Sequence, residues 1–382
     1  MFLYGCQHNE KELQLKQLWR TSIFESHTET AESIYPVHAD DRVLTAKLLD
    51  GAAPVFYALD GKQGGIDWQL TDTVCTGKVY YNMKPFVSKQ GICLPCGRAT
   101  TCVDIKTGKT RWVNEQSGQP EQTLEPYTNN SFLQAVNDWD GRQSHIREVS
   151  AIDGNARPIY TVRWPDSSKL LIRTPVKVNN KLLLFTAVKM RYGTNETVAK
   201  WHLLEHSTGE ILSEGEAYPG NRDGYGVTKQ PILIGDKAYM VAYDAVFCVS
   251  TTTGKELWRK KLPRDMLTSA PVVSKDGLYC PMEDGYIYKF NLADGSLVWK
   301  VKTAATPSRL VSAQDFLFIV GGSDGVLYAI SAKDGKVVKS LKAPNHYYIK
   351  NQFFRRFIGT DTNGEILILF DGNNFRGYKI WR

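Results

Sequence analysis

The sequence lacks any run of eighteen apolar residues, so no segment is long enough to cross a bilayer as a helix. It also lacks a dense block of lysine and arginine, although its formal net charge is +7. Without such a block or a basic stripe with interleaved aromatic residues, the charge favours a solvated basic surface over nucleic-acid binding. The charged (23%) and apolar (42%) fractions are ordinary and argue against disorder. A globular chain of 382 residues can form two domains or one large all-β unit.

A second CxxC motif is absent as well, although the chain has seven cysteines. The single motif, Cys93 to Cys96, therefore lacks the second ligand pair of a structural zinc site. It lies in a strand pattern with Pro95 inside it, whereas a redox CxxC begins a helix whose dipole lowers the thiol pKa. We therefore expect neither a metal nor a redox site. Cys102, on the next predicted strand, could form a disulfide with Cys93 or with Cys96.

The sequence shows no helical periodicity, but it does contain an internal repeat. A turn glycine recurs at intervals of 40 residues (Gly295 to Gly335) to 55 residues (Gly154 to Gly209). The aligned glycines are Gly65, Gly108, Gly154, Gly209, Gly254, Gly295 and Gly335. A period of this length is typical of the blades of a β-propeller.

The clearest repeat, Ala270 to Lys302, predicts four short strands. They are expected at residues 271–274, 278–282, 286–292 and 296–301, and an Asp-Gly pair stands at each of the three turns. The strand residues are largely β-branched or aromatic, and glycine after aspartate suits a turn that needs positive φ. Similar blocks run over residues 84–112, 230–258 and 308–338, and longer, decorated ones start near Ile34, Asn130 and Pro175.

A large aromatic residue follows most of the turn glycines. These residues are Trp68, Trp112, Trp258 and Trp299, with Tyr160, Ile211 and Val338 at or near the same place in the other blocks. Stacked blades leave a wedge that widens toward the rim, so each outer strand needs a bulky residue to fill it. We interpret the tryptophans as blade-packing residues and not as a sugar-binding or cofactor-stacking set.

The two chain ends predict how the ring closes. Three strands are expected after Val338, in "FRRFIGT", "EILILF" and "RGYKIW", and one before the first block, at Lys16 to Ile23 with Trp19 as its filler. Together they would make an eighth blade and remove an exposed seam. The prediction is an all-β, eight-bladed propeller at residues 16–382 preceded by a tether at residues 1–15, with seven blades as the alternative.

The block from Gly285 to Trp299 resembles the repeat of the quinoprotein-like propellers. One branch of that superfamily, the dehydrogenases that bind pyrroloquinoline quinone and calcium, commonly carries two adjacent cysteines, which this sequence lacks. In the present sequence, the carboxylates of Asp284, Asp294 and Asp324 stand beside turn glycines, where capping of the turn explains their presence. A catalytic residue, a cofactor site and a metal site are therefore not expected, and the quinoprotein dehydrogenase stays as the alternative function.

The chain looks closer to the BamB family, the lipoproteins of the outer-membrane barrel assembly machinery. The resemblance rests on the eight blades, the total length, the Trp-containing first strand and the chain end on a third strand. It implies a protein-binding scaffold, facing the periplasm at the outer membrane, that is a monomer outside its complex and needs no cofactor.

The residues around Cys6 (Leu3-Tyr4-Gly5-Cys6) resemble a lipobox, which would make Cys6 the lipidated residue. A complete signal needs a basic start and an apolar stretch of about 7–15 residues. Since Cys6 is the sixth residue, either translation starts upstream, the chain has been trimmed, or the match is chance.

The resemblance also implies a partner interface on the middle blades. The family's Leu-x-Leu-Arg run corresponds here to Leu170, Ile172 and Arg173, and Asp223 is the nearest acidic candidate in a loop of different length. The competing interpretation of Leu170 and Ile172 is an ordinary strand that faces the core. A third hypothesis is a sensor or interaction module that uses the decorated loops at residues 138–148 and 190–200, because binding residues often lie on such loops.

Overall fold

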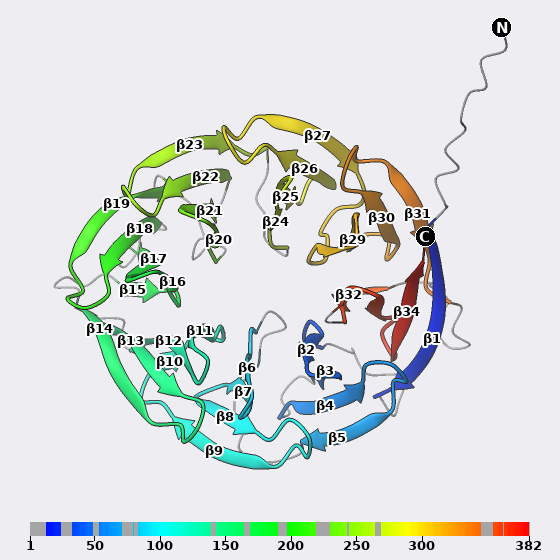
Figure 1. The fold of residues 1–382 in the computed structure, drawn as a ribbon, viewed down its shortest axis with the longest axis horizontal. Coiled ribbons are helices and arrows are strands. Elements are labelled where there is room, and N and C mark those ends of the chain that lie inside the picture. Colours follow the sequence, from blue (N-terminus) through cyan, green and yellow to red (C-terminus); the bar gives the residue numbers. More distant parts are fainter. Residues whose placement is uncertain are drawn as a thin grey trace, which may run out of the picture.

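Eight small antiparallel sheets form a closed ring in the computed structural model (Figure 1). The structure describes residues 13–23, 33–48, 53–70, 79, 83–138, 143–163, 169–189, 197–218, 230–242, 244–263, 269–344, 354–361 and 363–381. Each regular element in these ranges is a β-strand, and none of them contains a helix long and apolar enough to span a membrane. The prediction of an eight-bladed all-β propeller is confirmed, and the seven-bladed alternative is wrong.

The first four blades follow one another along the chain, each running from the ring centre outward. Blade 1 contains β2 (Val37–Ala39), β3 (Arg42–Lys47), β4 (Val55–Asp60) and β5 (Ile66–Leu70). Blade 2 contains β6 (Phe86–Ser88), β7 (Gly91–Cys96), β8 (Ala99–Val103) and β9 (Thr110–Glu115). Blade 3 contains β10 (Gln119–Pro120), β11 (Glu125–Thr128), β12 (Ser131–Asn137), β13 (Gln143–Ser150) and β14 (Ala156–Arg163). Blade 4 contains β15 (Lys169–Ile172), β16 (Val176–Val178), β17 (Lys181–Lys189), β18 (Thr197–Glu205) and β19 (Ile211–Tyr218). In blades 3 and 4 two short inner strands pair with the same neighbour.

The next three blades have four strands each, and the last blade combines both chain ends. Blade 5 contains β20 (Ile232–Ile234), β21 (Lys237–Ala242), β22 (Ala245–Ser250) and β23 (Glu256–Lys261). Blade 6 contains β24 (Val272–Ser274), β25 (Gly277–Pro281), β26 (Tyr286–Phe290) and β27 (Leu297–Lys302). Blade 7 contains β28 (Val311–Ala313), β29 (Phe316–Val320), β30 (Leu327–Ser331) and β31 (Val337–Leu341). Blade 8 contains β32 (Arg355–Thr360), β33 (Ile366–Phe370), β34 (Asn374–Trp381) and β1 (Gln14–Ser22).

Blade 8 closes the ring because β1 is its outermost strand and pairs antiparallel with β34 (Figure 1). The strand begins at Gln14, two residues before the expected start at Lys16. Inside the blade, Arg376 and Asp371 form a buried ion pair with Nε and Oδ2 2.6 Å apart, and Arg376 Nη1 also donates to Gln17 on β1. Closure by an N-terminal strand, as predicted, is confirmed.

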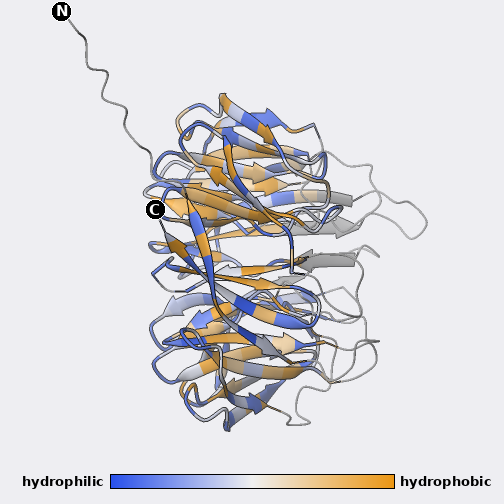
Figure 2. Cartoon of the chain, turned by 90° about the vertical axis from the view of Figure 1, so that its right-hand side faces the viewer, coloured by the Kyte–Doolittle hydropathy of each residue, from blue (hydrophilic) through white to orange (hydrophobic). Residues whose placement is uncertain are grey.

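The apolar core lies between neighbouring blades. One cluster, for example, joins Leu44 and Phe56 of blade 1 to Ile92 and Leu94 of blade 2, all fully buried. In the side view, apolar residues are concentrated along the strands (Figure 2). A single blade cannot cover both of its faces, so the blades stabilise one another only as a stack.

Four tryptophans of the outer strands lie against a turn glycine of the next blade. A Cβ atom added at these glycines would come within 2.7 Å of the indole ring, so only glycine leaves room for it. The glycine–tryptophan pairs are Gly64–Trp19, Gly108–Trp68, Gly154–Trp112 and Gly295–Trp258. Each indole Nε1 donates to a carbonyl of the next blade: Gly61 O (3.1 Å), Ile105 O (2.9 Å), Ala151 O (3.1 Å) and Leu292 O (3.2 Å). The indoles thus fill the wedge and also lock neighbouring blades through a hydrogen bond.

The fifth tryptophan, Trp299, lies against Gly335 in the same way, but its Nε1 has no hydrogen-bond partner among the described residues. The carbonyl of Ala332 instead accepts from Lys289 Nζ (3.0 Å) and Tyr279 Oη (3.3 Å). A charged lysine therefore takes over this link between blades.

The alignment on Gly65 is wrong by one residue. Gly64 has the positive φ of +76° and contacts Trp19, whereas a Cβ at Gly65 would meet nothing within 4 Å. Gly-Gly offers two candidates for one turn position, and the sequence does not distinguish them.

Two of the weaker filler residues are also wrong. Ile211 is 46% exposed, and Ser213 lies against Gly254 in its place. Val338 is 38% exposed, and the next residue, Lys339, occupies the position opposite Ala329 that corresponds to the tryptophans. Ser213 and Lys339 each stand four residues after their turn glycine, as Trp258 and Trp299 do, so the expected residues missed this spacing by two positions and by one.

Candidate protein-binding site

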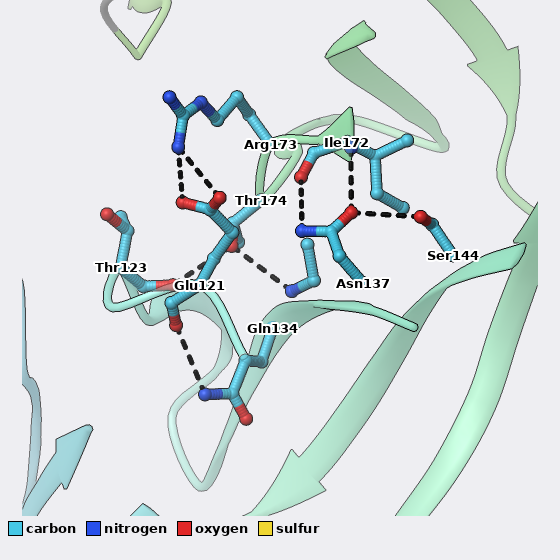
Figure 3. Close-up of polar contacts among 9 residues, drawn as sticks. Glu121, Thr123, Gln134, Asn137, Ser144, Ile172, Arg173 and Thr174 are labelled. Atoms are coloured by element: carbon cyan, nitrogen blue, oxygen red, sulfur yellow. Dashed lines mark hydrogen bonds and ion pairs between the residues drawn. The ribbon is translucent and has the colours of Figure 1, made fainter. Parts of the chain in front are cut away.

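The expected partner motif lies where blade 4 begins, against the end of β12 in blade 3. Asn137 holds the backbone of Ile172 from both sides, since its Nδ2 donates to Ile172 O (3.3 Å) and its Oδ1 accepts from Ile172 N (2.9 Å) (Figure 3). Ser144 Oγ donates to the same Oδ1 (2.9 Å) and fixes the amide orientation. This buried clamp holds the chain in one conformation directly before Arg173.

Arg173 points from this clamp toward a carboxylate of blade 3. Its Nη1 donates to both oxygens of Glu121, at 2.7 and 2.9 Å (Figure 3). The Arg173 side chain is 41% exposed and that of Glu121 17% exposed, so one side of the pair remains accessible to solvent. Such a half-exposed pair contributes only modestly to stability, about 0–1 kcal/mol.

The backbone beneath Glu121 is fixed by neutral hydrogen bonds. Gln134 Nε2 donates to Glu121 O (3.2 Å), and Thr174 Oγ1 donates to Thr123 O (3.0 Å). The same Thr174 hydroxyl accepts from the backbone N–H of Ala135 (3.2 Å). The arginine and its carboxylate are therefore presented on a rigid support that spans two blades.

The four predicted interface residues have different positions. Arg173 is accessible, but Ile172 is fully buried in the core and is not available to a partner, as the competing interpretation expected. Leu170 lies in β15 opposite Val188, and its side chain is outside the described residues. Asp223 is likewise outside the described residues, as is the lipidation candidate Cys6.

The sequence interpretation missed a second ion pair beside this site. Lys84 Nζ lies 2.6 Å from Glu125 Oε2, and Gln230 Nε2 donates to the same oxygen (2.7 Å). These residues join blades 2, 3 and 5 near the ring centre. The only available signal was the presence of two acidic residues, Glu121 and Glu125, before the motif in the chain.

Of the cysteines, Cys93 and Cys102 lie directly opposite each other on β7 and β8 and are buried free thiols. A hydrogen bond with Cys102 and burial raise the pKa of the Cys93 thiol. Cys96 is disulfide-bonded, and its partner lies outside the described residues. The proposed disulfide of Cys102 with Cys93 or Cys96 is therefore wrong.

Among the described residues, no group of three His, Cys, Asp or Glu side chains is arranged to hold a metal ion. The sequence interpretation overlooked one pair with the HxxxH spacing of zinc ligands, His202 and His206, but the two rings have separate partners and do not make such a site. His206 Nε2 lies 2.6 Å from Tyr127 Oη, and His202 Nδ1 lies 3.2 Å from Glu214 Oε2.

Several solved structures share this architecture at low identity. BamB from Moraxella catarrhalis has a TM-score of 0.61 at 13% identity, with 96% of this chain and 98% of that chain covered. A quinohemoprotein alcohol dehydrogenase from Pseudomonas putida HK5 has a TM-score of 0.63 at 12% identity, with coverages of 96% and 76%. The computationally designed Ika8 protein has a TM-score of 0.61 at 11% identity, with coverages of 96% and 99%. These likenesses define the class of fold, which scaffolds and dehydrogenases share.

The family follows from the sequence. The family model described as "Outer membrane protein assembly factor BamB" matches residues 15–214 and 202–347. The chain therefore belongs to the BamB family. A comparison with curated proteins gave no significant match.

Proposed function

We propose that this protein is a non-catalytic scaffold that binds other proteins and assists the assembly of outer-membrane β-barrel proteins. The observation that carries the proposal is the family match, which extends over seven of the eight blades. A rigid ring with protein-binding loops needs no reacting group for this role.

The surface that would bind a partner centres on Arg173 and Glu121. The Arg173 side chain is 41% exposed and already held by a carboxylate, so it loses little further conformational freedom when a partner docks. A partner carboxylate can share the arginine, and a partner cation can share Glu121. Strand addition at a blade edge is a further mode of binding open to an all-β ring.

The partner would be a subunit of the barrel assembly machinery, and the place of action would be the periplasmic side of the outer membrane. Both parts of the proposal come from family membership. Lipidation of Cys6 would supply the anchor, because the preceding Leu-Tyr-Gly resembles a lipobox.

Crosslinked affinity capture of the tagged full chain from its native membrane tests this proposal. Mass spectrometry should identify a barrel-assembly subunit and a diacylated Cys6 peptide. Recovery of an unmodified Cys6 peptide with no membrane partner would contradict both the proposed partner and the proposed lipid anchor.

The interface is tested with Arg173→Ala and Arg173→Glu. Both should weaken binding of the captured subunit, the second more, because the introduced carboxylate would repel Glu121. The matched control is Lys336→Glu, which changes charge at a side chain 79% exposed on blade 7. If Arg173→Ala, Arg173→Glu and Lys336→Glu all fold and bind the partner with equal affinity, Arg173 is not part of the interface.

A second candidate, a quinone-dependent dehydrogenase, is motivated by the fold shared with the quinohemoprotein alcohol dehydrogenase. The described carboxylates do not fit a calcium site, since no three of them are grouped and Asp284 and Asp324 accept hydrogen bonds from Tyr288 and Tyr328 of the strands that follow their turns. Titration with pyrroloquinoline quinone and calcium distinguishes the two functions. A stoichiometric spectral change would favour the dehydrogenase.

A further inference from the structure

A pocket of about 190 Å³ lies in the seam between blades 2 and 3. Its polar lining consists of Gln116 and Ser117, which follow β9, and His145, Arg147 and Arg157 of blade 3. The remaining three lining residues are apolar, and none of the eight is acidic. A cavity that holds a single water molecule needs only about 10–15 Å³ of such volume, so the pocket is large enough for a ligand of several atoms.

The feature that points to a ligand is the guanidinium of Arg147. Its Nη2 donates to two neutral amide oxygens, Asn114 Oδ1 (3.0 Å) and Gln134 Oε1 (3.1 Å). Its Nε is buried and has no hydrogen-bond partner within the described part of the chain. Burial lowers the pKa of Arg147 to about 10, so the group stays charged at neutral pH. Arg147 as a whole is half-buried, and it faces no carboxylate in the pocket lining.

Two carboxylates pair with other residues of the pocket lining and not with Arg147. Glu148 Oε2 accepts from Arg157 Nε (2.9 Å) and Nη2 (2.6 Å), while its Oε1 accepts from Ser131. Asp138 Oδ1 lies 3.8 Å from His145 Nε2. Within the described ranges Arg147 thus remains without a counter-charge, while Arg157, 67% exposed, stands at the rim.

We propose that this pocket binds a small phosphate-bearing anion, with the half-buried Arg147 as the inner anchor and Arg157 as the rim contact. A guanidinium offers a planar fork of donors that matches phosphate oxygens, and the Ser117 hydroxyl supplies a neutral donor, whereas Gln116 Nε2 already donates to Asn114. This proposal does not rest on the proposed scaffold role, since Arg173 and Glu121 are not among the residues that line the pocket.

Isothermal titration of the full chain with inorganic phosphate tests the site, with glycerol 1-phosphate and vesicles containing phosphatidylglycerol as parallel arms. One site per chain should bind phosphate. Arg147→Lys keeps the charge but loses the fork and should weaken binding about tenfold or more, as expected for loss of a hydrogen bond to a charged group. Arg157→Gln should weaken it less. The control is Arg42→Gln, which breaks a comparable ion pair with Asp67 on blade 1.

Phenylglyoxal labelling of the unaltered protein gives a readout that does not depend on whether a variant folds. Phosphate should protect Arg147 from modification in the mapped peptides. Stronger binding of glycerol 1-phosphate identifies a soluble phosphate ester as the ligand, and binding to vesicles alone identifies a lipid headgroup. Absence of saturable binding in all three arms, or binding that Arg147→Lys leaves unchanged, would overturn the proposal.

Discussion

The contact between Trp258 and Gly295 allows a direct test of how the blades are locked. Gly295 has φ of +69°, and a Cβ there would lie 2.5 Å from Trp258 Cε3. Gly235 has a similar φ of +58°, but a Cβ there would meet nothing within 4 Å. The two glycines therefore share the backbone strain of a left-handed residue and differ in the contact with the indole.

Gly235→Ala should cost only the backbone strain, about 1–2 kcal/mol. Gly295→Ala adds the overpacking of the indole, about 1–3 kcal/mol, for a total of about 2–5 kcal/mol. Urea unfolding followed by far-ultraviolet circular dichroism measures both, with the slope checked for two-state behaviour.

A double-mutant cycle separates the contact from the strain. Trp258→Ala alone should cost about 3–5 kcal/mol, because it leaves a cavity and removes one of the two hydrogen bonds that Leu292 O accepts, the other coming from Tyr239 Oη. In the double variant with Gly295→Ala the clash is gone, so the total should be smaller than the sum by about 1–3 kcal/mol. Equal costs for the two glycine variants, together with additive costs in the cycle, would refute the idea that the indole requires glycine.

Three further outcomes follow from buried or hydrogen-bonded groups. Asp371→Asn breaks the buried pair with Arg376 and should cost about 3–5 kcal/mol in thermal unfolding, with faster amide exchange in β1. For Asp276, burial raises the pKa but hydrogen bonds to the carboxylate outweigh it and lower the pKa to about 2. The ionised Asp276 carboxylate therefore stabilises the fold above about pH 4, and this stabilisation is lost toward pH 2. The difference in the free energy of unfolding between Asp276→Asn and the unaltered protein should therefore shrink on acidification. Burial raises the pKa of Cys248 to about 11 and also raises that of Cys280, so a thiol reagent at pH 8 should label both only upon unfolding.

The strands of the propeller were predictable because each blade carries its own local signals. In blade 6 the Asp-Gly turns predicted four strands, and the last, expected at residues 296–301, is observed at Leu297–Lys302. The register of the outer strands was less predictable. Blade 4 has the same β-bulge beside its packing position as blades 5 and 6, and the position is Ser213, four residues after Gly209, just as Trp258 is four residues after Gly254.

The sites were predictable only in part, because their contacts join residues that are distant in the sequence. Arg173 was found through family resemblance, but its partner Glu121 lies 52 residues earlier. The burial of Ile172 depends on Asn137, 35 residues away, which holds its backbone. Arg147 had no motif at all, since one partner, Asn114, comes from the neighbouring blade and the other, Gln134, lies opposite it in the pairing of β12 with β13.

The two proposed sites are connected through one side chain, and this connection has a measurable consequence. Gln134 is fully buried, accepts from Arg147 Nη2 (3.1 Å) and donates to Glu121 O (3.2 Å), so it spans the blade between the pocket and the Arg173 support. An anion that repositions Arg147 should therefore shift the Nε–H resonance of Arg173 in nitrogen-15 spectra. Gln134→Leu should abolish that shift, whereas Thr100→Val, which removes only a hydroxyl donor to Gln134 Oε1 (3.2 Å), should preserve it. If phosphate binds at Arg147 and the Arg173 resonance stays in place, the two sites act independently and the buried amide serves only to pack the blade.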